Sequence, residues 1–112
     1  MECIFCRIAA GQIGSDKVYE DDDIFAFRDI TPKAPVHVLI IPKRHYASIL
    51  ETGEDDKIVC GMIAAASRIA GELGVDKDGF RIVVNTGRNG GQSVDHLHLH
   101  LLGGRAMGWP PG

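Results

Sequence analysis

Residues 96–102 alternate histidine with leucine, in the order His-Leu-His-Leu-His-Leu-Leu. Successive side chains of a β-strand point to opposite faces, so this period of two predicts a strand with three histidines on one face and leucines on the other. The leucines are expected to face a core, which leaves a row of imidazoles outside it. One such histidine would be typical of a polar strand surface, whereas three indicate a functional site. Imidazole acts as nucleophile, proton donor or metal ligand, so a catalytic row and a three-histidine zinc site both remain open.

Helical periodicity is clearest over residues 54–73, where apolar side chains recur every three or four positions and form one stripe. Thr52 and Asp55 resemble a capping box at the start of this helix. Cys60, within it, is expected to be part of the core. A shorter helix is expected over residues 3–9.

Five segments have the β-branched, aromatic or alternating composition of strands. The expected strands cover residues 17–20, 23–28, 36–41, 80–85 and 95–102. The short Asp-rich and Pro-rich connections favour antiparallel pairing over parallel crossovers. The sequence therefore predicts an α+β fold, with one five-stranded antiparallel sheet and with one long and one short helix packed on one of its faces.

The length of 112 residues predicts a single domain over residues 1–112. A hydrophobic content of 45% argues against a disordered chain, and a net charge of −3 argues against a nucleic-acid-binding surface. No apolar run approaches the roughly 20 residues of a membrane helix. The N-terminus shows no secretory pattern and the three cysteines are an odd number, so a reducing compartment, the cytoplasm, is expected.

A glycine-rich polar stretch, residues 85–93, lies just before the histidines. Glycines let backbone N–H groups approach an anion closely, and the Asn, Arg and Ser side chains add donors. Beside imidazoles, this stretch indicates a phosphate-binding loop, and thus phosphoryl or nucleotidyl chemistry in which a neutral histidine attacks phosphorus. His37, in the strand expected over residues 36–41, is either an ordinary core or edge histidine or a further member of the row.

Cys3 and Cys6 form a C-x-x-C pair, a spacing that suits zinc but supplies two of four ligands. His45 and His96 are the available nitrogen donors. Free structural thiols remain the alternative. A redox pair is disfavoured because no thioredoxin-like βαβ pattern follows.

Together these motifs resemble the histidine triad (HIT) superfamily, whose signature alternates three histidines with apolar residues as residues 96–102 do. Other segments resemble its nucleotide-binding Hint branch: residues 27–37, 41–45, 90–94, 102–105 and 107–112, the last ending in Trp-Pro-Pro-Gly. The resemblance spans essentially the whole chain. It implies a homodimer in which the long helix and a central strand of each subunit pair, making one ten-stranded sheet.

The resemblance also implies binding of purine nucleoside monophosphates and hydrolysis of nucleoside phosphoramidates, such as AMP joined to an amine. His98 resembles the nucleophile that forms a nucleotidyl-histidine intermediate. His100 and His37 resemble its helpers in phosphate binding and proton handling, and His96 completes the catalytic set that the resemblance implies. The residues that resemble nucleotide contacts are Phe27, Asp29, Ile30, Asn85, Gly91, Gln92, Ser93, His98, His100 and Trp109. Within that set Asp29 resembles the ribose ligand, and Ser93 resembles a residue near the departing amine. Trp109 resembles the tail aromatic that reaches toward the partner's substrate pocket.

Bacterial relatives with the same C-x-x-C pair imply a closed tetrahedral zinc site. Its ligands would be Cys3, Cys6, His45 and His96. This zinc would be structural, tying the N-terminal helix to the catalytic strand and leaving His98 free to attack. No Mg²⁺ is expected to be required, because backbone N–H groups of residues 90–93 and His100 would stabilise the phosphoryl oxygens.

Two residues depart from the branch pattern near the leaving-group side, Asp95 and Gly108. They bear on which amine is preferred and not on the attack by His98. Three other functions remain open. The first is hydrolysis of dinucleoside polyphosphates, against which the Trp-Pro-Pro-Gly ending weighs. The second is a nucleotide-binding regulatory role without catalysis, against which the complete set of catalytic-type residues weighs. The third is a zinc-dependent module in which the metal is the active agent.

Overall fold

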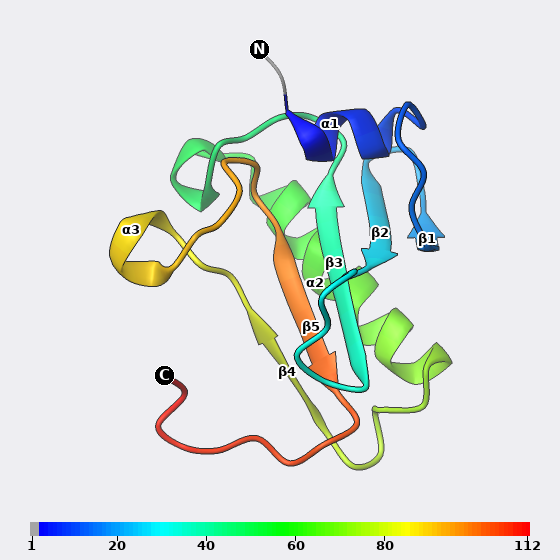
Figure 1. The fold of residues 1–112 in the computed structure, drawn as a ribbon. Helices are drawn as coiled ribbons and strands as arrows, with labels where there is room; N and C mark the ends of the chain where they lie inside the picture. Colours follow the sequence, from blue (N-terminus) through cyan, green and yellow to red (C-terminus); the bar gives the residue numbers. More distant parts are fainter. Residues whose placement is uncertain (1–2) are drawn as a thin grey trace.

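The computed structural model describes residues 3–112, and Figure 1 shows that they form an α+β fold. The helices are α1 (Ile4–Ala9), α2 (Asp56–Glu72), α3 (Gly87–Gly90) and the 3₁₀ turn η1 (Ile49–Glu51). The strands are β1 (Lys17–Glu20), β2 (Ile24–Arg28), β3 (Val36–Pro42), β4 (Phe80–Val83) and β5 (Leu99–Gly103). Met1 and Glu2, which entered the prediction of the cellular compartment, lie outside the described residues. Among the described residues, no helix is both long and apolar enough to cross a membrane.

The five strands form one sheet in the order β1-β2-β3-β5-β4, and every neighbouring pair is antiparallel. This confirms the predicted five-stranded antiparallel sheet. At its centre β3 pairs with β5, with His37 opposite Leu102 and Leu39 opposite His100. Because residues two apart in a strand share a face, this register brings His37 and His100 to the same face of the sheet. β4 lies at one edge.

Each face of the sheet carries its own apolar cluster. On one face α2 packs against Leu97, Leu99 and Leu101, all of which are buried. On the other face α1 inserts Phe5 and Ile8 among large side chains of β2 and β3. These are Phe25, Phe27, Leu39 and Ile41. The two helices therefore lie on opposite faces, and the expectation that both pack on one face is wrong. Both faces of β2 and β3 carry large apolar side chains, so both need cover.

The strand expected over residues 95–102 begins later, at Leu99. The backbone N–H of Leu97 donates to the carbonyl of Tyr46 at 2.7 Å instead of joining the ladder with β3. The alternation nevertheless persists through this segment. Leu97 belongs to the cluster under α2, whereas His96 and His98 both contact Phe5 on the opposite face.

The long helix is shorter than expected, and its N-cap is Asp55, whose carboxylate accepts from the N–H of Ile58 at 3.4 Å. Thr52 therefore does not cap it, because the η1 turn occupies the preceding residues. Cys60 is exposed, so the expectation that it is part of the core is wrong. The buried residues of α2 lie on the side of the helix that packs on the sheet. They are Met62, Ala65, Ala66, Ile69 and Ala70.

Candidate functional site

Three histidines meet on the sheet face that carries α1. The rings of His98 and His100 have centroids 4.9 Å apart, and Nε2 of His37 lies 2.9 Å from Nδ1 of His100. Phe5 of α1 packs edge-on against His98, with ring centroids 5.2 Å apart. His98 is 3% exposed, so its ring is held by packing. The prediction of a shared histidine face is confirmed, and His37 joins it.

A main-chain carbonyl determines which nitrogen of His98 carries the proton. Nδ1 lies 2.7 Å from the carbonyl oxygen of His96. A carbonyl oxygen only accepts, so Nδ1 carries the hydrogen and donates it. The Nε2 atom of the neutral ring then holds a lone pair, and no hydrogen bond among the described residues uses it. This arrangement presents a nucleophilic nitrogen.

The same reasoning assigns the protons of His37 and His100. The backbone N–H of Lys33 donates to Nδ1 of His37 at 3.0 Å, so that nitrogen is unprotonated and Nε2 carries the hydrogen. Nε2–H of His37 then donates to Nδ1 of His100, with the Asp29 carboxylate 3.4 Å away. His100 must therefore carry its hydrogen on Nε2. That atom is the one buried side-chain nitrogen or oxygen in the described chain that has no partner.

Burial keeps the rings of His37 and His100 neutral near pH 7. Burial, together with the charges of His98 and His37, lowers the pKa of His100 to about 4. Burial also lowers the pKa of His37, although the carboxylate of Asp29 opposes the shift. A neutral His100 offers its buried Nε2–H as a hydrogen-bond donor without bringing a full charge into the site.

Asp29, His37 and His100 also place ligand-type atoms close enough together to hold a metal ion. Their hydrogen bonds favour a different use. A cation bound by Nε2 of His37 would force its proton onto Nδ1, where it would face the N–H of Lys33. A metal ion at all three histidines of the row would also take up the lone pair on Nε2 of His98, the nitrogen that the HIT resemblance assigns to the attack.

The glycine-rich stretch forms an exposed loop around the one-turn helix α3. Gly87 and Gly91 adopt φ of 69° and 76°, left-handed conformations that favour glycine. The side chain of Gln92 spans the loop: its Nε2 donates to the carbonyls of Ala47 and Val94 at 2.6 and 3.0 Å. Its Oε1 accepts from the N–H of Gly87 at 3.1 Å. Gln92 therefore braces the loop, and the short helix within it was not expected from the sequence.

The side chains expected beside a nucleoside differ in exposure. Phe27 is buried against Phe5, with ring centroids 5.6 Å apart. Asp29 is half-buried beside His37, and its Oδ1 accepts from the N–H of Thr31 at 2.8 Å. Ile30 is 95% exposed, which is unusual for a large apolar side chain and leaves it available to a ligand.

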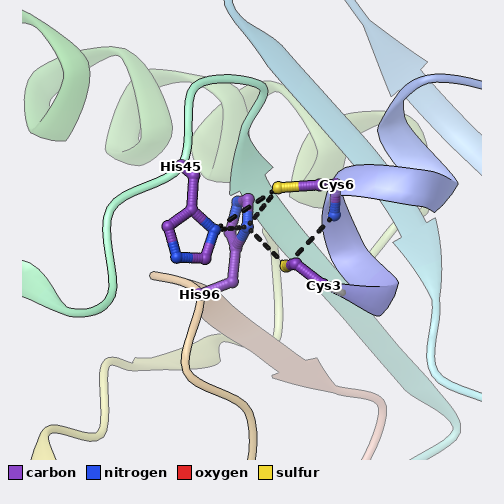
Figure 2. A group of neighbouring side chains, drawn as sticks. All are labelled: Cys3, Cys6, His45 and His96. Carbon is purple, nitrogen blue, oxygen red and sulfur yellow. Dashed lines mark hydrogen bonds between the residues drawn. The ribbon is translucent and has the colours of Figure 1, made fainter. Parts of the chain in front are cut away.

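Cys3, Cys6, His45 and His96 converge at the end of α1, as Figure 2 shows. The C-x-x-C pair presents both sulfurs because Cys3 is the N-cap of α1, which places Cys6 one turn away. Nε2 of His96 contacts the carbonyl of Pro42 at 2.8 Å, so Nε2 carries the hydrogen and the lone pair of Nδ1 faces the sulfurs. One ligand atom from each residue lies within 4.8 Å of the others. The sequence prediction that these four residues come together is confirmed.

The distances in this cluster fit a single small cation. Tetrahedral zinc, with Zn–S of about 2.3 Å and Zn–N of about 2.0–2.1 Å, places sulfur and nitrogen about 3.5 Å apart and two nitrogens about 3.3 Å apart. The sulfur–nitrogen distances here are 3.3, 3.3 and 3.5 Å, and the two Nδ1 atoms are 3.1 Å apart. Two thiol sulfurs and two imidazole nitrogens are also a donor set that zinc binds. The four residues can hold a metal ion.

The C-terminal tail is held against the edge strand β4. Nη2 of Arg81 donates to the carbonyl of Gly108 at 2.8 Å, and its guanidinium lies 6.0 Å from the centre of the Trp109 ring. Trp109 is nevertheless 83% exposed. Asn85 and Ser93 lie at the two ends of the glycine-rich loop, half-buried and exposed respectively.

Sequence reasoning missed several groups that shape the site. These are the packing of Phe5 on His98, the Lys33 N–H, the Pro42 and His96 carbonyls, and Arg81. Most act through main-chain atoms or through a tertiary contact. No residue type marks a main-chain partner, so the sequence carried no signal for them.

Comparison with known proteins agrees with this geometry. The HIT domain model matches residues 10–107. The purine nucleoside phosphoramidase of Escherichia coli K12 is 46% identical over 108 residues, covering 96% of this chain and 91% of that protein. The HIT family hydrolase from Legionella pneumophila Philadelphia 1 matches with a TM-score of 0.96 and 49% identity, covering 99% of this chain and 100% of the other. A Zn-bound histidine triad family protein from Mycobacterium smegmatis matches with a TM-score of 0.81 and 35% identity, covering 94% of this chain and 76% of the other. With its histidine row and these matches along nearly its whole length, the chain belongs to the HIT family.

Proposed function

We propose that the protein is a hydrolase that cleaves the P–N bond of purine nucleoside 5′-phosphoramidates, in which AMP is joined to an amine. The relative in E. coli is named as a purine nucleoside phosphoramidase. One observation carries the proposal: His98, with a lone pair on Nε2, and His100, with a partnerless Nε2–H, have ring centroids 4.9 Å apart. In the proposed site the first attacks phosphorus and the second donates to a phosphoryl oxygen.

The proposed reaction takes place in two steps at the α-phosphorus. Nε2 of His98 bonds to phosphorus while the P–N bond of the substrate breaks, and the nitrogen keeps the electron pair, takes a proton from solvent water and leaves as the amine. Water then attacks the nucleotidyl-His98 intermediate, the bond from phosphorus to Nε2 breaks, and the nucleoside monophosphate departs. In the intermediate the ring retains its Nδ1–H against the His96 carbonyl, which supports the positive charge of the substituted imidazole.

The remaining site residues have proposed roles around this reaction. Of the backbone N–H groups of residues 90–93, those of Gly91 and Gln92 already donate to the carbonyls of Arg88 and Gly87, both at 3.1 Å. The N–H of Ser93 therefore remains to hold the phosphoryl oxygens together with His100, and the reaction needs no Mg²⁺. Ser93 lies on the side of the departing amine. Asp29 binds the ribose, and Phe27 and Ile30 flank the nucleoside. Asn85 contributes to the phosphate side, and Gln92 contributes by bracing the loop.

The metal ion proposed for Cys3, Cys6, His45 and His96 is a structural zinc. When bound, zinc supplies a cross-link between α1 and the segment that carries His98. Its support comes from the ligand distances and from the Zn-bound relative. Because thiolate ligands need reducing surroundings, a cytoplasmic location accompanies this proposal.

The proposed partner is a second copy of the chain. Large apolar side chains are exposed around η1, α2 and β4: Ile49, Leu50, Ile63, Phe80 and Ile82. A cavity of about 100 Å³ between these elements is lined almost wholly by apolar groups. Pairing of two such faces would join two sheets into one of ten strands and bring Trp109 of one subunit toward the partner's nucleotide. The absence of nucleic-acid and membrane partners stays a prediction from charge and hydropathy.

The decisive test of the activity is His98→Asn, which removes the nucleophilic nitrogen and retains a side-chain donor for the His96 carbonyl. Turnover of an adenosine 5′-phosphoramidate is expected to disappear, while AMP binding measured by calorimetry changes little. Wild-type protein quenched in acid-free denaturant should retain radiolabelled AMP on His98. Undiminished turnover in His98→Asn would contradict the proposed nucleophile.

Two comparisons separate this function from its alternatives. Cys60→Ser is the matched control for His98→Asn, because Cys60 is exposed on α2, across the sheet from the histidines. Faster cleavage of a diadenosine polyphosphate than of the phosphoramidate would favour the polyphosphate hydrolase. Tight AMP binding with no turnover of either substrate would favour a regulatory protein.

A further inference from the structure

An unbroken chain of hydrogen bonds leads from the C-terminal segment to the catalytic histidines. Nε–H of Arg105 donates to the carbonyl of Lys33 at 3.0 Å. The N–H of the same residue donates to Nδ1 of His37, also at 3.0 Å, and Nε2 of His37 lies 2.9 Å from Nδ1 of His100. Both polar main-chain groups of Lys33 are therefore engaged, one by Arg105 and one by His37.

The sheet register explains why these groups meet. β3 and β5 pair with Val36 opposite Gly103, so the loop before β3 lies beside the segment after β5. Gly104 has a φ of 89°, and a Cβ atom added there would lie 2.9 Å from Cβ of Pro35. The backbone at Gly104 thus presses against the loop that contains Lys33, and Arg105 follows directly.

The two imidazoles admit two proton arrangements, and one of them suits the chemistry. With the Lys33 N–H on Nδ1 of His37, both rings carry hydrogen on Nε2 and His100 offers a donor to the phosphoryl group. With that N–H turned away, Nδ1 of His37 is free to carry the hydrogen. His100 would then donate from Nδ1 to Nε2 of His37, and its own Nε2 would present a lone pair to an anionic phosphoryl oxygen. That arrangement repels the substrate's charge.

We propose that Arg105 is a positioning residue that, by holding the Lys33 carbonyl, fixes the main chain of Lys33 with its N–H directed at His37, and thereby selects the proton arrangement in which His100 donates to the phosphoryl group. Lys33 lies in an exposed loop outside the strand ladders, so its orientation depends on local contacts. The Lys33 side chain makes a separate contact, from Nζ to the carbonyl of Thr31 at 3.0 Å. Among the described residues, the carbonyl of Lys33 itself accepts a hydrogen bond from Arg105 alone. The inference rests on the proposed function only where turnover is measured.

The test compares Arg105→Met with Arg68→Met. Arg68 also donates through Nε, to Glu72 on α2, but its contacts lie on the other side of the sheet. Two-bond ¹H–¹⁵N spectra of the imidazoles at neutral pH report which nitrogen of each ring is protonated. For the wild type and Arg68→Met we expect His37 and His100 protonated on Nε2. For Arg105→Met we expect a second, Nδ1-protonated form of His100 and a kcat lowered by about tenfold with little change in KM.

Arg105→Lys separates position from charge, because it keeps the cation and loses the Nε–H. We expect it to resemble Arg105→Met, and it carries the same test if the methionine variant does not fold. The inference is overturned if wild-type His37 carries its proton on Nδ1, or if both Arg105 variants keep the wild-type proton positions. If the wild type fails to cleave phosphoramidates, the proposed function falls, while the spectra still decide the role of Arg105.

Discussion

The pKa of His100 predicts a specific loss of stability in acid. An ordinary histidine has a pKa of 6.5, whereas burial holds His100 at about 4 in the folded protein. Above 6.5 both folded and unfolded states are neutral at this residue. As the pH falls below 6.5, the unfolded chain binds a proton that the folded chain excludes, so stability is lost. At about 1.4 kcal/mol per pH unit, the free energy of unfolding falls by about 2 kcal/mol near pH 5 and by about 3 kcal/mol below pH 4.

The assay is urea unfolding of the wild type and His100→Gln at several pH values between about 7.5 and 5. Other groups that lose stability in acid are shared by both proteins, so the difference between the two unfolding free energies isolates the His37–His100 pair. We expect His100→Gln to be the less stable protein near pH 7.5 and to recover about 2 kcal/mol relative to the wild type near pH 5. Two parallel curves over this range would refute the assignment of a neutral, half-buried His100.

Four further predictions concern the framework that holds the site and the proposed dimer. Gly103→Ala places a Cβ atom 2.8–3.0 Å from three atoms of Val75 and should cost about 1–3 kcal/mol of unfolding free energy, which a second change, Val75→Ala, should largely restore. Leu101→Ala, at a fully buried residue under α2, should cost about 2–5 kcal/mol in urea unfolding, with m unchanged. Removing the metal with a chelator should lower the Tm of the wild type by about 10 °C or more. Cys6→Ser should no longer respond to the chelator, so an equal change in Tm in the wild type and in Cys6→Ser would count against the metal site. Ile63→Glu should convert the proposed dimer to a monomer in sedimentation measurements, because it buries a charge at an apolar contact.

Local patterns were sufficient for most of the fold. The alternation in residues 96–102 predicted the two faces correctly even though the strand itself begins at Leu99, because burial of the leucines does not require every residue to join the ladder. Periodicity located α2 to within two residues at its start, and the strand over residues 17–20 matches β1. Cys60 shows the limit of such patterns. Its position in an amphipathic helix suggested burial, but Cys60 lies two residues, about 200° around the helix, from the buried Met62 and is exposed.

From the sequence alone came the set of chemical groups: a row of imidazoles, a glycine-rich loop, and two cysteines with two histidines to complete a metal site. Side-chain identity and the strand period are enough for that, since both are local properties. Only the tertiary structure decided which nitrogen of each ring holds a proton. That choice depends on main-chain N–H and carbonyl groups at Lys33, Pro42 and His96, which every residue possesses and which become specific only when the chain folds and brings one of them within hydrogen-bond distance of a ring.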